Sequence, residues 1–210
     1  YTGGCNLKCP YCHSRDLVYL KENMYPIVTE KINEYLESHR KDLDGIYISG
    51  GEPLMHEGVV SFLQYAKTLN YKIKIHTNGM FYERLKTILA QKLVDHVSLD
   101  IKNAPSAYAK TCGVEDMDLK DIEKSLDLLK QSVVPYDICV TLVDELHNQA
   151  TIEELGEWIQ GVDTVILQPF EDRETTIDHS LHRPSFKVVL KYKKIFEKYV
   201  KHVKIRGDQA

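Results

Sequence analysis

Short runs rich in β-branched and other apolar residues alternate along the chain with longer segments whose apolar residues recur at helical spacing. The short runs predict six strands, at residues 46–49, 72–76, 96–100, 136–143, 164–167 and 203–206. The longer segments predict six helices, at residues 29–39, 57–69, 81–91, 119–131, 152–160 and 185–199. This alternation is typical of an α/β fold with parallel strands and helices packed outside them.

Six strand–helix repeats predict a partial (βα)6 barrel of the TIM type rather than an open sandwich. No internal repeat, low-complexity tract or linker divides the 210 residues, which predicts a single domain over residues 1–210. Pro184 is expected in a first helical turn, and Thr151 is expected to start the helix that contains Glu153. The chain opens at Tyr1, directly before a group of cysteines, so we expect the natural protein to extend further at its N-terminus.

Distinctive polar segments follow the predicted strands at the point where each one ends. Residues 50–53 follow the first strand and residues 77–79 the second, while residues 100–102 end the third. Gln168 and Pro169 follow the fifth. In barrels of this type the loops at the carboxyl ends of the strands carry the chemistry, so these segments are expected to share one rim.

Composition narrows the possible partners. Hydrophobic residues make up 43% and charged residues 28% of the chain, which is ordinary for a soluble globular protein. The net charge of −4 does not favour nucleic acid or an anionic membrane as a partner. No apolar run approaches the roughly 20 residues of a transmembrane helix. Since no signal peptide opens the sequence, a cytoplasmic location is the expectation.

Three of the five cysteines fall within the first twelve residues, with C-x3-C-x2-C spacing: Cys5, Cys9 and Cys12. An odd number gathered at one end is a poor disulfide framework and a good metal framework. Three thiolates on an iron–sulfur cubane would leave one iron open to a ligand, much as three protein ligands leave catalytic zinc open. By spacing alone a zinc knuckle, with His13 as fourth ligand, stays possible, although adjacent residues seldom both reach one tetrahedral ion.

The segment from Thr2 to His13, with Tyr11 directly before the last cysteine, resembles the signature of the radical S-adenosylmethionine (SAM) superfamily. Within it, the segment is most similar to glycyl-radical-enzyme activating proteins, above all those of anaerobic ribonucleotide reductase. The resemblance implies a [4Fe–4S] cluster on Cys5, Cys9 and Cys12, with SAM on the open iron. The residues it places near SAM are Tyr11, Ser49, Gly50, Gly51, Glu52, Thr77, Asn78, Asp100, Lys102 and Gln168.

The resemblance implies a role for most of these residues, and each has a plainer alternative. The segment from Ser49 to Glu52 would receive the SAM amino group, or it is only a strand-to-helix turn. Lys102, beside Asp100, would face the SAM carboxylate, or the two form a solvated charge pair. Thr77 and Asn78 match the pattern, although Asn-Gly is also a common turn. Tyr11 would lie beside the adenine or pack over the cluster, and Gln168 would place backbone groups near the adenine.

Two positions depart from the activating-enzyme pattern. His76 stands where these enzymes usually carry an acidic residue that helps to bind a monovalent cation, and imidazole is a poor ligand for such an ion. Cys139 stands on the strand expected to carry an arginine that contacts SAM. Cys112 and Cys139 are both predicted to be buried packing thiols. With no further C-x-x-C, an auxiliary cluster has no evident place.

The sequence therefore predicts a radical SAM oxidoreductase that cleaves SAM to a 5′-deoxyadenosyl radical under anaerobic conditions. The expected partners are a glycyl radical enzyme, such as anaerobic ribonucleotide reductase, and an electron donor such as flavodoxin or ferredoxin. One alternative is a radical SAM enzyme that modifies a small molecule or a peptide, for example one resembling deazapurine synthase. A second alternative is a zinc-binding module without catalysis.

Overall fold

Six parallel strands form one sheet, and they lie side by side in the order in which they occur along the chain. The computed structural model describes residues 1–22 and 24–207. The strands are β1 (Gly45–Ile48), β2 (Lys72–Thr77), β3 (His96–Asp100), β4 (Tyr136–Leu142), β5 (Thr164–Pro169) and β6 (His202–Ile205). The predicted parallel α/β fold is confirmed, and every predicted strand is present within one or two residues of its expected bounds.

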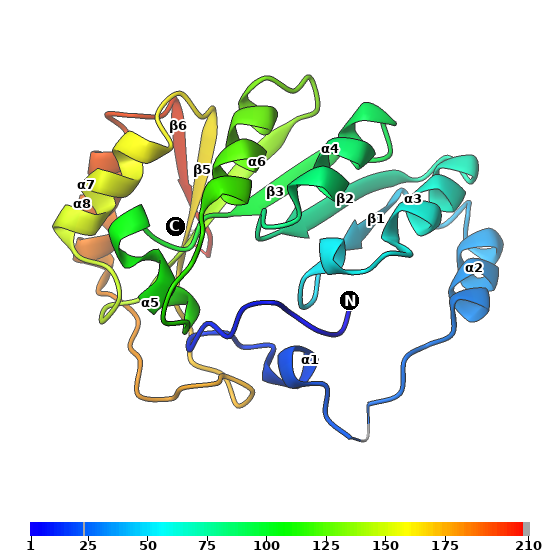
Figure 1. The fold of residues 1–210 in the computed structure, drawn as a ribbon, viewed down its shortest axis with the longest axis horizontal. Coiled ribbons are helices and arrows are strands. Elements are labelled where there is room, and N and C mark those ends of the chain that lie inside the picture. Colours follow the sequence, from blue (N-terminus) through cyan, green and yellow to red (C-terminus); the bar gives the residue numbers. More distant parts are fainter. Residues whose placement is uncertain (23, 208–210) are drawn as a thin grey trace.

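Helices follow the strands on the outer face of the sheet, whereas the N-terminal segment passes along the opposite side (Figure 1). The α-helices are α1 (Arg15–Tyr19), α2 (Thr29–Ser38), α3 (Val59–Thr68), α4 (Tyr82–Ala90), α5 (Tyr108–Cys112), α6 (Lys120–Lys130), α7 (Gln149–Trp158) and α8 (Phe186–Phe196). Two 3₁₀ turns, η1 (Pro53–Met55) and η2 (Pro105–Ala107), complete the fold. The sequence pattern misses α1 and α5 because five residues are too few to show helical periodicity.

Three local expectations are wrong. Helix α7 starts after Asn148, whose side chain accepts a hydrogen bond from the Thr151 backbone N–H at 3.1 Å. Thr151 is therefore the third residue of the helix and forms a capping box with Asn148. Helix α8 is capped by Ser185, which places Pro184 before the helix rather than in its first turn. Strand β5 continues through Pro169, so Gln168 lies within the strand and not in a following loop.

The sheet has an apolar outer face and a largely polar inner face. On β2, Ile73, Ile75 and Thr77 are buried, while the alternate residue His76 is only half-buried. Side chains alternate across a strand, so His76 points to the other face of the sheet. The inner-face residues Tyr47, His76, Asp100, Thr141 and Gln168 all line one cavity. This inner face therefore positions the candidate site.

No helix in the described residues has the length and apolar character that crossing a membrane requires.

The two phenylalanines of α8 differ in their surroundings. Phe196 is fully buried, whereas Phe186 is 55% exposed. Phe196→Ala should lower the free energy of unfolding by about 3–5 kcal/mol, because it removes buried apolar surface and leaves a cavity. Phe186→Ala is the control and should change it by less than about 0.5 kcal/mol. Urea unfolding of the apoprotein measures both, and equal effects would contradict this packing.

Candidate active site

The cysteine-bearing segment is joined to the end of β1 by backbone hydrogen bonds. The Thr2 N–H donates to the Ser49 carbonyl at 2.8 Å, and the Gly51 N–H donates to the Thr2 carbonyl at 2.8 Å. The Glu52 N–H donates to the Gly4 carbonyl at 2.9 Å. Thr2 and Gly50 thus form a parallel bridge, which holds the segment beside the first strand.

Gly50 and Gly51 are required by this pairing. Gly50 has φ +131°, a conformation that side chains rarely adopt, and a Cβ there would lie 2.4 Å from the Thr2 backbone. A Cβ on Gly51 would lie 1.8 Å from the Gly4 carbonyl oxygen. The close backbone approach expected of this Gly-Gly pair therefore exists, and it is made to the chain's own cysteine-bearing segment.

The three clustered cysteines line the same cavity, which has a volume of about 290 Å³. The Leu7 N–H donates to Cys5 Sγ and the Ser14 N–H donates to Cys12 Sγ, each at 3.4 Å. Burial raises the pKa of the Cys5 thiol to about 11. A hydrogen bond from the buried Cys112 thiol is the main reason that the pKa of Cys9 is lowered to about 7. Cys112 is thus a packing thiol in contact with the cysteine loop.

The spacing of these thiols bears on the zinc alternative. In a tetrahedral zinc site with Zn–S bonds of about 2.3 Å, the sulfurs lie about 3.8 Å apart. Among the described residues, the sulfur atoms of the three clustered cysteines do not all lie within 4.8 Å of one another. The same holds when His13 replaces one of the cysteines. The thiolates of an iron–sulfur cluster each bind a different iron and so stand further apart. The loop therefore fits a polynuclear cluster better than a single zinc ion.

The structure brings every site residue expected from the sequence to this one cavity. Besides the three cysteines, its lining includes Tyr11, Ser49, Gly50, Gly51, Glu52, Thr77, Asn78, Asp100, Lys102 and Gln168. Sequence reasoning missed Tyr47, Arg173 and Arg206, which line it too. Arg206 follows β6 at the same rim and donates to the Gln168 side chain at 2.8 Å. Arg206 ends the predicted strand at residues 203–206, and a charged residue at a strand end was the available signal for it.

Glu52 joins the ends of β1 and β2. Its carboxylate accepts hydrogen bonds from Thr77 Oγ1 at 2.7 Å, from the Asn78 backbone N–H at 2.7 Å and from the Leu54 backbone N–H at 2.9 Å. The side chain is buried, and burial raises the pKa of this carboxyl against the opposing effect of the three donors. Glu52 therefore orders the rim of the cavity through contacts within the protein.

Asp100 is the centre of a hydrogen-bonded chain on the inner face. Its Oδ1 lies 2.7 Å from His76 Nε2, and its Oδ2 lies 2.7 Å from Lys102 Nζ. His76 Nδ1 in turn lies 2.7 Å from the Tyr47 hydroxyl. Burial alone would raise the pKa of Asp100, but His76 and Lys102 hold it well below its usual value. Asp100 is therefore an anion at neutral pH.

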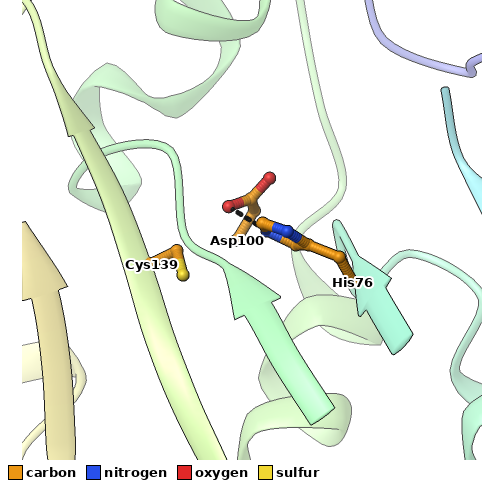
Figure 2. Close-up of side chains that lie close together, drawn as sticks. All are labelled: His76, Asp100 and Cys139. Carbon is orange, nitrogen blue, oxygen red and sulfur yellow. Dashed lines mark hydrogen bonds and ion pairs between the residues drawn. The ribbon is translucent and has the colours of Figure 1, made fainter. Parts of the chain in front are cut away.

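The two departures from the activating-enzyme pattern meet in space. His76 and Cys139 both face Asp100, and Figure 2 shows the three side chains converging from β2, β3 and β4. Cys139 is buried, as predicted for a packing thiol, but its neighbours are polar.

Comparison with known proteins agrees with the geometry. Residues 1–159 match the family description Radical SAM superfamily. A protein of Methanocaldococcus jannaschii, named "putative glycyl-radical enzyme activating enzyme", is 31% identical over 209 residues, which cover 97% of this chain and 85% of that protein. A GTP 3′,8-cyclase of Alkaliphilus oremlandii is 24% identical over 163 residues, which cover 76% of this chain but only 49% of that protein.

The solved structures agree on the fold. The structure of Streptococcus suis SuiB bound to S-adenosylmethionine superposes with a TM-score of 0.77 at 15% identity, covering 99% of this chain and 49% of that one. The fold, the rim and the family match together define a radical SAM enzyme with a partial TIM barrel. The chain belongs to the radical SAM superfamily, whose members are characterised by a [4Fe–4S] cluster and SAM.

The three hydrogen bonds to Glu52 predict a stability effect. Glu52→Gln would replace one acceptor oxygen with an NH2 group that faces N–H or O–H donors, so the free energy of unfolding should fall by about 1.5–3 kcal/mol. Glu57→Gln, at an exposed position, should leave it within about 0.5 kcal/mol. Urea unfolding of the apoprotein at neutral pH tests both, and an unchanged E52Q variant would show that these bonds do not hold the rim.

Proposed function

We propose that this chain is an activating enzyme that forms a glycyl radical on a partner protein. The observation that carries this proposal is the match to the M. jannaschii protein along nearly the whole of both chains. The match to the GTP cyclase leaves about half of that larger protein without a counterpart in this chain. The activating enzyme is therefore the better whole-length comparison.

In this proposal Cys5, Cys9 and Cys12 hold a [4Fe–4S] cluster. The loop suits it because its thiols are not drawn together as a single ion would require, and because two of them already accept backbone N–H bonds. When bound, the cluster supplies the electron that breaks a sulfonium carbon–sulfur bond of SAM, giving methionine and a 5′-deoxyadenosyl radical. A flavodoxin or ferredoxin is the class of donor that would reduce it.

The residues of the rim would bind and orient SAM. Lys102, held beside Asp100, offers a fixed positive charge for the methionine carboxylate. The carbonyl groups around Gly50 and Gly51 can accept from the ammonium group, and Tyr11, Thr77, Asn78 and Gln168 belong to the same lining. Arg206 adds a second cation at the cavity, in a fold where β4 carries Cys139 instead of arginine.

The proposal predicts that Cys9→Ala abolishes cluster assembly. The variant keeps two thiols of the loop, too few to hold the cluster, so iron and sulfide should fall to background after anaerobic reconstitution. Cys112→Ser is the matched control, since Cys112 is a buried cysteine in contact with the same loop, and it should retain iron at the level of the unmodified protein. Full iron content in the Cys9 variant would contradict the assignment.

The target is tested by incubating the reconstituted protein with SAM, a reductant and anaerobic ribonucleotide reductase. We expect 5′-deoxyadenosine together with a glycyl-radical EPR signal, and no signal when the partner's radical glycine is replaced by alanine. Formation of 5′-deoxyadenosine that depends on an added small molecule, with no protein radical, would instead favour a small-molecule substrate. The overlap with the GTP cyclase and the altered residues His76 and Cys139 make that the second candidate.

A further inference from the structure

His76, Asp100 and Cys139 bring one nitrogen, one oxygen and one sulfur donor together on the inner face of the sheet. The three residues come from the neighbouring strands β2, β3 and β4, and Asp100 is the register partner of Cys139. Their ligand atoms all lie within 4.8 Å of one another, and His76 Nε2 lies 2.7 Å from Asp100 Oδ1 (Figure 2). Among the described residues, no other three metal-binding side chains bring their ligand atoms this close together.

We propose that these three side chains form a second metal site, separate from the cysteine loop, that takes a divalent ion of the zinc class. Ligands of a tetrahedral zinc ion stand about 3.3–3.8 Å apart, so side-chain movements of about 1 Å would complete the site. Thiolate and imidazole donors favour zinc and its transition-metal neighbours over magnesium or calcium, which prefer oxygen.

The surroundings of the three side chains are those of a supported metal site. Ligating histidines commonly donate their second ring N–H to an oxygen acceptor, and His76 Nδ1 already lies 2.7 Å from the Tyr47 hydroxyl. Ligating carboxylates are usually hydrogen-bonded as well, and Asp100 Oδ2 is held by Lys102 while Oδ1 faces the site. Lys102 thus occupies Oδ2, and Oδ1, whose partner is the neighbouring ligand His76, is the oxygen that would bind a metal.

Metal binding rearranges protons in a balanced way. Burial raises the pKa of the Cys139 thiol, so without metal it is protonated, and binding of a divalent ion would release that proton to solvent. On the imidazole of His76, the proton that Nε2 directs to Asp100 would pass through solvent to Nδ1, which faces the Tyr47 hydroxyl, so the Cys139 proton is the one released overall.

Three protein ligands leave a fourth position for water or a substrate atom. His76 and Asp100 line the cavity described above, whereas Cys139 lies buried behind them. The open position would therefore face the cavity. The same ion would also link three adjacent strands, β2, β3 and β4.

Zinc K-edge X-ray absorption on the anaerobically reconstituted full chain, loaded with one equivalent of zinc, tests the proposal. The method sees zinc alone, so an iron cluster on the cysteine loop does not interfere. We expect one sulfur at about 2.3 Å with two or three nitrogen or oxygen neighbours at about 2.0–2.1 Å. Zinc bound in the cysteine loop would instead have three sulfur neighbours. That result would overturn the proposal, whether or not the iron–sulfur cluster assembles.

Variants separate a built site from adventitious binding. Cys139→Ser should remove the single sulfur neighbour, and His76→Ala should abolish retention of zinc after gel filtration. Tyr47→Phe should weaken zinc binding by about 10–100-fold, because it removes the partner of the ligating imidazole. His182→Ala is the control: His182 also pairs with a carboxylate, Glu145, but on the surface, and zinc binding should not change. Zinc content that is independent of both His76 and Cys139 would refute the site.

Circular dichroism and urea unfolding of each zinc-free variant show whether it is folded. Cys139→Ser and Tyr47→Phe are close in shape to the original residues, so they test the site even if His76→Ala is unstable. Failure of the unmodified, folded protein to retain zinc would also refute the proposal, whatever the outcome for the cysteine loop.

Discussion

The parallel backbone pairing between the first residues of the chain and the end of β1 is the constraint on which the candidate site depends. Three hydrogen bonds between Thr2 or Gly4 and the segment 49–52 hold the cysteine loop at the carboxyl edge of the sheet. The contact is so close that a Cβ on Gly51 would overlap the Gly4 carbonyl. The Gly-Gly pair is thus explained by packing of the chain against itself, before any ligand is considered.

The same contact extends inward through Glu52. The backbone of Glu52 is tied to Gly4, while its carboxylate is tied to the start of the loop after β2. One residue therefore connects the cysteine loop, β1 and β2. Because all six strands are parallel and in chain order, each following strand delivers its own polar end to the same edge. A buried carboxylate is costly without donors, and here three donors offset part of that cost.

Much of the fold could be predicted because the pattern repeats. Strand β3, for example, places the apolar residues Val97 and Leu99 between polar ones and ends at Asp100, and its predicted bounds are those observed. The rim residues could be predicted because a parallel sheet places all strand ends together. The boundaries of α7 and α8 could not, since Asn148 and Ser185 act through side-chain bonds that several nearby residues could equally form.

The convergence of His76 and Cys139 lay beyond sequence reasoning for a different reason. They are 63 residues apart along the chain, and their proximity depends on the register of two strand pairs, β2 with β3 and β3 with β4. A shift of one residue in either pair would turn one of these side chains to the outer face of the sheet. Tyr47 is subject to the same condition, because its contact with His76 depends on the register of β1 with β2.

Asp100 then becomes the group that two proposed sites share. One of its oxygens faces His76 and the proposed metal, and the other holds Lys102, the proposed partner of the SAM carboxylate. An ion on Oδ1 would withdraw negative charge from the carboxylate and weaken its hold on Lys102, leaving that cation freer to pair with another anion. Such coupling is reciprocal by linkage, so whatever SAM does to the affinity for metal, the metal must do to the affinity for SAM. The resemblance to activating enzymes implies an acidic residue at the position of His76 and an arginine on the strand of Cys139. In this chain His76 and Cys139 both face Asp100, so the two departures together change the charge balance around one carboxylate.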